Sequence, residues 1–73
     1  MDHDSVLLRV GLNLREARLR AGLSQEQLGL STGLDRTYIS GIERGVRNPT
    51  VIVLARIASG LGVSVADLVA AIQ

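Results

Sequence analysis

The chain has 73 residues with no cysteine, one histidine, one proline and a formal net charge of +1. This length fits one domain, residues 1–73, whose small core is only marginally stabilising, so a homodimer is the default expectation. The lack of cysteine excludes a disulfide scaffold, and with one histidine neither a metal site nor a cofactor is expected.

Membrane and secretion signals are missing from the sequence. No apolar run approaches the roughly 18 residues of a transmembrane helix. The first residues, MDHDS, are acidic rather than signal-like. We therefore expect a soluble, cytoplasmic protein without a membrane partner.

The basic residues are unevenly distributed, although the net charge is small. All eight are arginines, and Arg36, Arg44 and Arg47 lie close together in the sequence. Asp2 and Asp4 fall in the first four residues, which we expect to be a flexible tail. A small net charge can therefore hide one basic face that attracts phosphate.

The hydrophobic spacing predicts an all-α protein with five helices. The first helix is expected over residues 5–21, with Val10, Leu14 and Ala17 at helical spacing and Gly22 as its stop. No strand alternation, repeat or linker is present. The class is therefore all-α.

Capping residues delimit the second and third helices. Ser24 opens the second, and Gln27 three residues later completes a capping-box pattern. This helix should end at the turn around Gly33. Asp35 is a suitable N-cap for the third helix, and Gly45 is its expected stop.

The remaining helices follow a loop at residues 46–49. Thr50 should cap the fourth helix, which is expected to reach about Ser59 because Gly60 and Gly62 follow. Residues 64–67 form a second capping pattern, from which the fifth helix is expected to run to about Ile72.

Residues 25–44, QEQLGLSTGLDRTYISGIER, match the twenty-residue helix-turn-helix template. Gly29 supplies the small residue needed where the two helices meet, and Gly33 suits a turn with positive φ. Apolar contacts come from Leu28, Leu34, Ile39 and Ile42. These coincident constraints indicate a reader of double-stranded DNA.

The third helix has two chemically distinct faces. Ile39 and Ile42 point toward the second helix at 100° per residue. The opposite face is polar or small and carries Arg36, Thr37, Ser40, Gly41 and Arg44.

We expect this polar face to read bases in a major groove. Arg36 can fork onto N7 and O6 of guanine, Thr37 can touch a thymine methyl group, and Ser40 can donate or accept. Gly41 would let the helix approach DNA closely. The alternative is an ordinary solvated polar face.

Tyr38 has two open interpretations, half-buried packing or contact with DNA. Arg44 and Arg47 are better placed for phosphates than for bases. Asn48 joins them, although Asn before Pro is also common in turns. Gln25, in the first turn of its helix, is expected to hold a phosphate, with an exposed helix-start glutamine as the alternative.

Two charged residues occupy positions that face the core. Glu43 follows Ile39 by four residues, and Arg18 follows Leu14 by four. An unpaired charge in such a position is costly, so we predict an Arg18–Glu43 ion pair. The alternative is that each side chain reaches water independently.

The last two helices carry more apolar side chains than a small domain can bury. Six are expected in the core: Leu54, Ile57, Ala58, Leu61, Val63 and Leu68. The others are candidates for a two-fold dimer interface: Val51, Ile52, Val53, Val65, Val69 and Ile72.

From Leu14 to Leu68 the chain resembles the Cro/C1-type (XRE) helix-turn-helix family. The resemblance rests on LREARLRAGLSQEQL, GLDRTYISGIERG and NPTVIVLARIASGLGVS. It implies a compact five-helix domain of the lambda-repressor-like DNA-binding type. It also implies a bacterial or phage homodimer on a pseudo-palindromic DNA operator.

The family assigns roles to matching residues of this chain. Those matching Arg18 and Glu43 form an internal ion pair. Residues facing bases or the nearby backbone match Arg36, Thr37, Tyr38 and Ser40. Residues facing phosphates match Gln25, Arg44, Arg47 and Asn48. At Gly29 the family more often has alanine, so the helix is slightly loosened here.

A narrower stretch, LDRTYISGIERGVRNPT, is similar to controller proteins of restriction–modification systems. Such proteins regulate their own gene and the endonuclease gene. An XRE repressor or antitoxin-type regulator is the alternative, because it shares all but the narrow motif. The operator sequence and the choice between activation and repression stay open.

Two other classes of protein fit less well. An enzyme is disfavoured because no carboxylate pair is supported by a histidine or a ligand cluster. A protein-interaction module would have no need of the arginines around the third helix. No separate effector domain or small-molecule site is evident, which suggests control through protein concentration.

Overall fold

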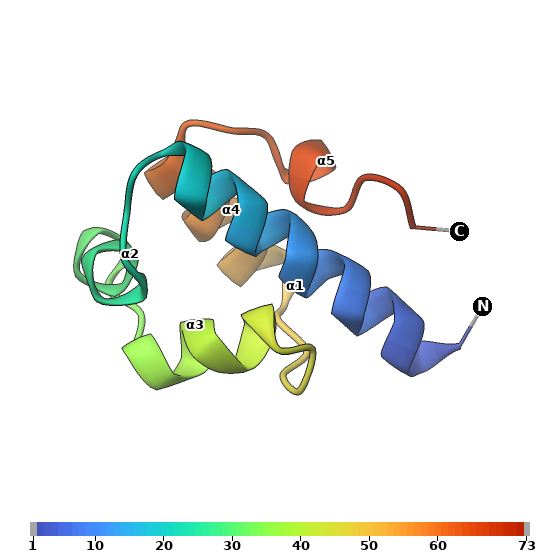
Figure 1. Ribbon diagram of the computed structural model, residues 1–73. Coiled ribbons are helices and arrows are strands. Elements are labelled where there is room, and N and C mark those ends of the chain that lie inside the picture. Colours follow the sequence, from blue (N-terminus) through green and yellow to red (C-terminus); the bar gives the residue numbers. More distant parts are fainter. Residues whose placement is uncertain (1, 73) are drawn as a thin grey trace.

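Five helices make up the part of the chain that the computed structural model describes, residues 2–72. They are α1 (His3–Arg20), α2 (Gln25–Thr32), α3 (Arg36–Glu43), α4 (Val51–Leu61) and α5 (Val65–Leu68). In Figure 1, α1 crosses in front of α4, α2 and α3 lie to the left and below, and α5 closes the upper side. The predicted all-α class and the helix-turn-helix formed by α2 and α3 are confirmed. No helix within residues 2–72 has the length and apolar character needed to cross a membrane.

Side-chain caps fix the starts of α2 and α3. The Ser24 hydroxyl accepts from the Gln27 N–H at 3.0 Å, and the Gln27 side-chain oxygen accepts from the Ser24 N–H at 2.8 Å. Gly33 ends α2 with φ 73°. Asp35 then accepts from the Thr37 N–H at 2.7 Å and begins α3. The local sequence therefore sets where the two helices start and stop.

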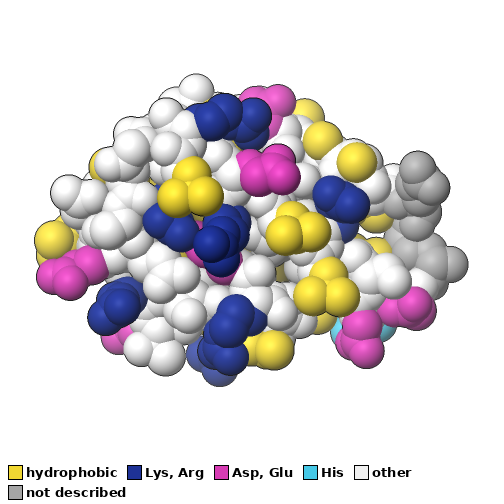
Figure 2. Space-filling view, viewed as in Figure 1, with side chains coloured by type: hydrophobic (Ala, Val, Ile, Leu, Met, Phe, Trp, Pro, Cys, Tyr) yellow, Lys and Arg dark blue, Asp and Glu magenta, His cyan; other side chains and the backbone are white. Residues whose placement is uncertain are grey.

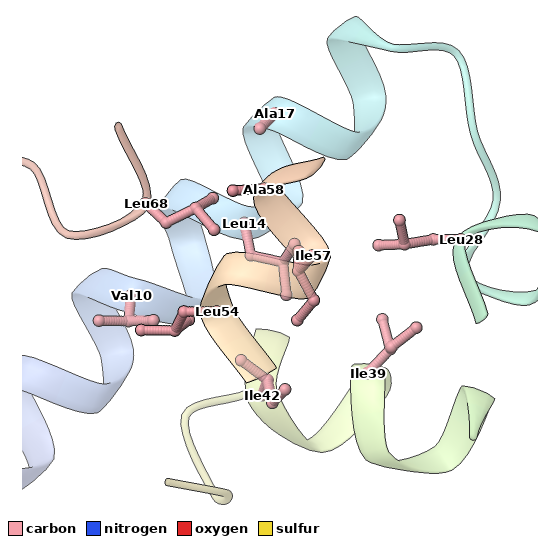
Figure 3. Close-up of a cluster of buried hydrophobic side chains, with 10 residues drawn as sticks. All are labelled: Val10, Leu14, Ala17, Leu28, Ile39, Ile42, Leu54, Ile57, Ala58 and Leu68. Atoms are coloured by element: carbon pink, nitrogen blue, oxygen red, sulfur yellow. The ribbon is translucent and has the colours of Figure 1, made fainter. Parts of the chain in front are cut away.

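The core joins α1 and α4 to the two helices of the motif. Figure 3 shows Leu14 of α1 and Ile57 of α4 at the centre of the cluster. Leu28 and Ile39 extend it into α2 and α3, and both are fully buried. The other buried apolar members are Val10, Ala17, Ile42, Leu54, Ala58 and Leu68.

Two glycines let backbones approach closely around α3. A Cβ on Gly11 of α1 would collide with the carbonyl oxygens of Ile42 and Glu43, so α1 lies directly against the end of α3. A Cβ on Gly29 would stand 2.7 Å from the Leu34 carbonyl oxygen in the turn. The predicted need for a small residue at position 29 therefore has a specific cause.

The beginning of α1 differs from the expected flexible tail at residues 1–4. His3 and Asp4 already belong to the helix, so the prediction is wrong for them. The cause is Asp2, whose carboxylate accepts from the Ser5 N–H at 2.8 Å and the Ser5 hydroxyl at 3.0 Å. Met1 lies outside the described residues.

The sequence suggested that Gly60 would break α4. In the structure Gly60 lies inside this helix. A Cβ at this position would come within 2.8 Å of the Thr32 methyl carbon. The glycine therefore marks the place where α4 packs against the end of α2. The helix ends at Gly62, which has φ 70°.

The fifth helix is shorter than expected and ends at Leu68 rather than near Ile72. The Asn13 side-chain amide donates to the carbonyl oxygens of Leu68 (3.0 Å) and Ala70 (2.7 Å). Ala71 then adopts a left-handed conformation with φ 64°. The segment after α5 is thus held against α1 in a turn instead of continuing as a helix.

A buried ion pair connects α1 with the last turn of α3. Arg18 Nε donates to Glu43 Oε2 at 2.6 Å, and Arg18 Nη2 donates to Glu43 Oε1 at 3.0 Å. A third bond runs from Arg18 Nη1 to the Leu23 carbonyl at 2.8 Å. The two side chains are only 9% and 3% exposed. The bond to Glu43 raises the pKa of Arg18 above its ordinary value. These are the residues that the sequence had paired.

Breaking this pair from one side should destabilise the protein strongly. Arg18→Met and Glu43→Gln should each lower the free energy of unfolding by about 3–5 kcal/mol, because each leaves a buried charge without its partner. The double variant should cost less than the sum by at least about 1 kcal/mol. Urea unfolding measures all three values.

Arg15→Met provides the control, because Arg15 is an exposed arginine on the same helix. It should change the free energy of unfolding by no more than about 0.5 kcal/mol. Strict additivity of Arg18→Met and Glu43→Gln would contradict a coupled pair.

Candidate nucleic-acid interface

The two faces of α3 differ as the sequence predicted. Ile39 and Ile42 are buried against the core, whereas Arg36 and Thr37 are exposed and Ser40 is half-buried. Figure 2 shows arginine side chains along the lower edge of the molecule, where α3 lies in Figure 1. The outward face of α3 is therefore polar and accessible.

The start of α2 and the outward face of α3 enclose a small hollow of about 150 Å³. Its lining consists of Gln25, Arg36, Thr37 and Ser40. A guanidinium, an amide and two hydroxyls can all donate hydrogen bonds, so this hollow suits phosphate oxygens or the acceptor edges of bases. Four of the predicted DNA-contacting residues are thus brought together.

Gln25 is also connected to the buried ion pair. Its Nε2 donates to Glu43 Oε1 at 3.2 Å, so one amide proton is directed into the protein. The chain of bonds runs from Arg18 through Glu43 to the first turn of α2. The position of Gln25 is therefore set by the same carboxylate that anchors α3.

A second hollow lies between α3 and the loop that follows it. It is about 320 Å³ in size and is lined by residues of α3, its C-cap and the loop. Its lining consists of Asp35, Thr37, Tyr38, Gly41, Arg44, Val46 and Arg47. The structure thus places Arg44 and Arg47 on the same side as Thr37. Asn48 is exposed in the adjacent loop.

Gly41 corrects one expectation from the sequence. It was expected to lie open on the outward face of α3, but it is buried. A Cβ added there would overlap Cγ of Arg47. The Arg47 side chain therefore covers Gly41, and its guanidinium carbon lies 5.2 Å from the centre of the Tyr38 ring.

Tyr38 combines features of its two interpretations. The ring is half-buried and packs against the core. Arg47 lies on that ring, and both residues line the hollow on the outward side of α3. Nothing in the sequence indicated this contact, because it depends on how the loop folds back.

The candidate dimer residues fall into two groups. Val51 and Ile52 at the start of α4 are 72% and 74% exposed. The other four are partly buried against the core: Val53, Val65, Val69 and Ile72. Of the six residues expected in the core, Leu61 and Val63 are only half-buried.

No constellation for metal binding occurs in the part of the chain described by the structure. No group of three or more His, Cys, Asp or Glu side chains there is arranged to hold a metal ion. The chemistry on offer at the α3 face is hydrogen bonding and positive charge.

Comparison with known proteins gives concordant results. The sequence model of the helix-turn-helix family HTH_3 matches residues 14–68. An uncharacterized HTH-type transcriptional regulator, y4dJ of Sinorhizobium fredii, is 47% identical over 60 residues, which cover 82% of this chain and 78% of that protein. The control protein C.MunI of Mycoplasma sp is 37% identical over 71 residues, 96% of each chain.

A solved structure shows the same arrangement of helices. It is the restriction-modification controller protein C.AhdI from Aeromonas hydrophila, which is 41% identical to this chain. The superposition covers 88% of this chain and 97% of that one, with a TM-score of 0.85.

Proposed function

Because the chain belongs to the helix-turn-helix family HTH_3 and is a DNA-binding transcriptional regulator, we propose that it is a restriction–modification controller. It would bind a pseudo-palindromic operator as a homodimer and regulate its own gene and the endonuclease gene. The observation that carries the proposal is the similarity over nearly the whole length of C.MunI and C.AhdI. The family is one of regulators rather than enzymes.

A regulator outside restriction–modification systems is the second candidate. It is favoured by y4dJ, which is 47% identical and is named only as an HTH-type regulator. A protein-interaction module that does not read DNA fits less well. The exposed arginines beside α3 would then have no use.

Base reading is assigned to the outward face of α3. Arg36 is exposed at the first helical position of α3, and its planar guanidinium can donate two hydrogen bonds to guanine N7 and O6. The base-reading set is Arg36, Thr37, Tyr38 and Ser40. The phosphate-contacting set flanks it on both sides: Gln25, Arg44, Arg47 and Asn48.

Dimerisation is assigned to the apolar surface of the last two helices. Val51 and Ile52 expose most of their side chains to water, which is unfavourable unless a partner covers them. Val53, Val65 and Val69 would contribute at its edge, together with Ile72. Two copies related by a two-fold axis then present two reading helices to one operator.

We place the protein in the cytoplasm.

Binding to its own upstream DNA tests the proposed function directly. A footprint should cover two symmetric half-sites. Two phosphate-side arginines per protomer give about four cations per dimer and a slope of log affinity against log salt near −3.6. Flat, weak binding at all salt concentrations would instead favour an interaction module. Adjacent endonuclease and methyltransferase genes are expected, and their absence would favour the second candidate.

Arg36→Ala should reduce specific binding by about 1–3 kcal/mol per half-site, because a bidentate contact with one base pair is lost. Competition between the footprinted site and its single-base variants measures the effect, and preference should relax at one position only. Arg20→Ala is the control, since Arg20 is an exposed arginine at the C-terminal end of α1 and is not assigned to DNA contact. An equal loss on specific and random DNA would make Arg36 a phosphate contact.

Ile52→Glu should convert the dimer into monomers, because a charge would be buried in the apolar interface. Affinity for the operator should fall about 100-fold or more, since the two half-sites are no longer linked. Sedimentation measures the association state.

Leu19→Glu is a matched control for this experiment. Leu19 is 56% exposed and lies on α1, outside the residues assigned to the interface or to DNA. It should leave the dimer intact. A persistent dimer in Ile52→Glu would place the interface elsewhere.

A further inference from the structure

The outward face of α3 contains a buried glycine. Glycine inside a helix is less favourable than alanine, so its presence at position 41 needs a reason. The three atoms nearest to a Cβ built there all belong to one side chain. They are Cγ of Arg47, which would be overlapped, Cδ at 3.4 Å and Cβ at 3.6 Å. The missing side chain of Gly41 therefore leaves room for the stem of Arg47.

The backbone after α3 brings Arg47 to this position. The Val46 N–H donates to the Gly41 carbonyl at 3.0 Å, and the Gly45 N–H donates to the Ile42 carbonyl at 3.0 Å. Gly45 has φ 76°. This pair of bonds is a Schellman motif, which reverses the chain at a helix end. The next residue, Arg47, consequently lies alongside the helix that has just ended.

An aromatic ring holds the far end of the same side chain. The guanidinium carbon of Arg47 lies 5.2 Å from the Tyr38 ring centre, within the range of a cation–π contact. The stem of Arg47 is thus fixed over Gly41 and its charged head over Tyr38. We call these three residues the Arg47 seat.

We propose that Gly41 is a positioning residue for DNA binding, because it allows Arg47 to lie across α3 in one orientation on the proposed DNA-binding face. The proposal rests on the proposed function, in which Arg47 contacts DNA. A long side chain loses much rotamer freedom when it is immobilised on binding. Arg47 is exposed, but its contacts with Gly41 and Tyr38 restrict this freedom already in the free protein, which favours binding.

The Arg47 seat can be tested without DNA. Tyr38 is the only Phe, Tyr or Trp residue of the chain, and Arg47 lies over its ring, so a ring-current shift of the Arg47 methylene protons in NMR spectra reports this contact. Wild-type protein should show upfield-shifted Arg47 protons. Gly41→Ala should move them to ordinary positions while the protein stays folded, because alanine favours the helix. Unchanged Arg47 shifts in Gly41→Ala would overturn the proposal.

The effect on DNA binding is tested in two backgrounds. The probe is the duplex recovered by selection from a random library with wild-type protein. Gly41→Ala in the wild-type background should weaken binding about tenfold per half-site, because Arg47 must now be ordered on binding. In the Arg47→Ala background, Gly41→Ala should cause no further loss of affinity. The alanine at position 47 keeps only Cβ, which lies at an ordinary distance of 3.6 Å from a Cβ at position 41.

The comparison of backgrounds distinguishes the Arg47 seat from a direct role of Gly41 at DNA. If Gly41 is needed for close approach of α3 to DNA, Gly41→Ala will weaken binding equally in both backgrounds, and the proposal is overturned. If wild-type protein selects no sequence, the proposed function fails. The NMR comparison still decides the Arg47 seat in that case.

Discussion

The orientation of α3 depends on the buried contact between α1 and the end of this helix. Gly11 brings the two backbones together, and the Arg18–Glu43 pair joins their side chains. Replacing a buried ion pair by apolar groups is often neutral for stability. The main contribution of the Arg18–Glu43 pair is therefore to hold the end of α3 in one position against α1. Because Glu43 also accepts from Gln25, the same carboxylate connects α3 with α1 and with the first turn of α2. One buried charge thus aligns both halves of the motif.

The outward surface of α3 is built by loops as much as by the helix itself. Asp35 fixes its first turn, and the Schellman motif at Gly45 returns the chain along its side. A loop arginine thereby shares a hollow with Thr37. A short helix of eight residues gains a wider polar surface in this way, without extra length.

Local signals in the sequence predicted most of the fold. Ser24, Asp35 and Gly33 act on backbone groups within a few residues, so their effects follow from the sequence alone. Arg18 and Glu43 were paired because helical spacing turns both inward. The roles of Gly41 and Gly60 were not predictable. Each depends on a side chain from another segment, Arg47 or Thr32, and sequence shows only that a side chain is missing.

The double hydrogen bond from Asn13 has a thermodynamic consequence for the end of the chain. Four residues of helix cannot hold α5 and the turn after it by backbone bonds alone. The carbonyl oxygens of Leu68 and Ala70 accept from the same Asn13 amide group. Residues 65–72 should therefore open as a single unit when these two hydrogen bonds break. Val69 and Ile72 would then leave the core together. If two copies pair through these residues as proposed, ordering of this segment and assembly of the dimer are linked equilibria, each favouring the other.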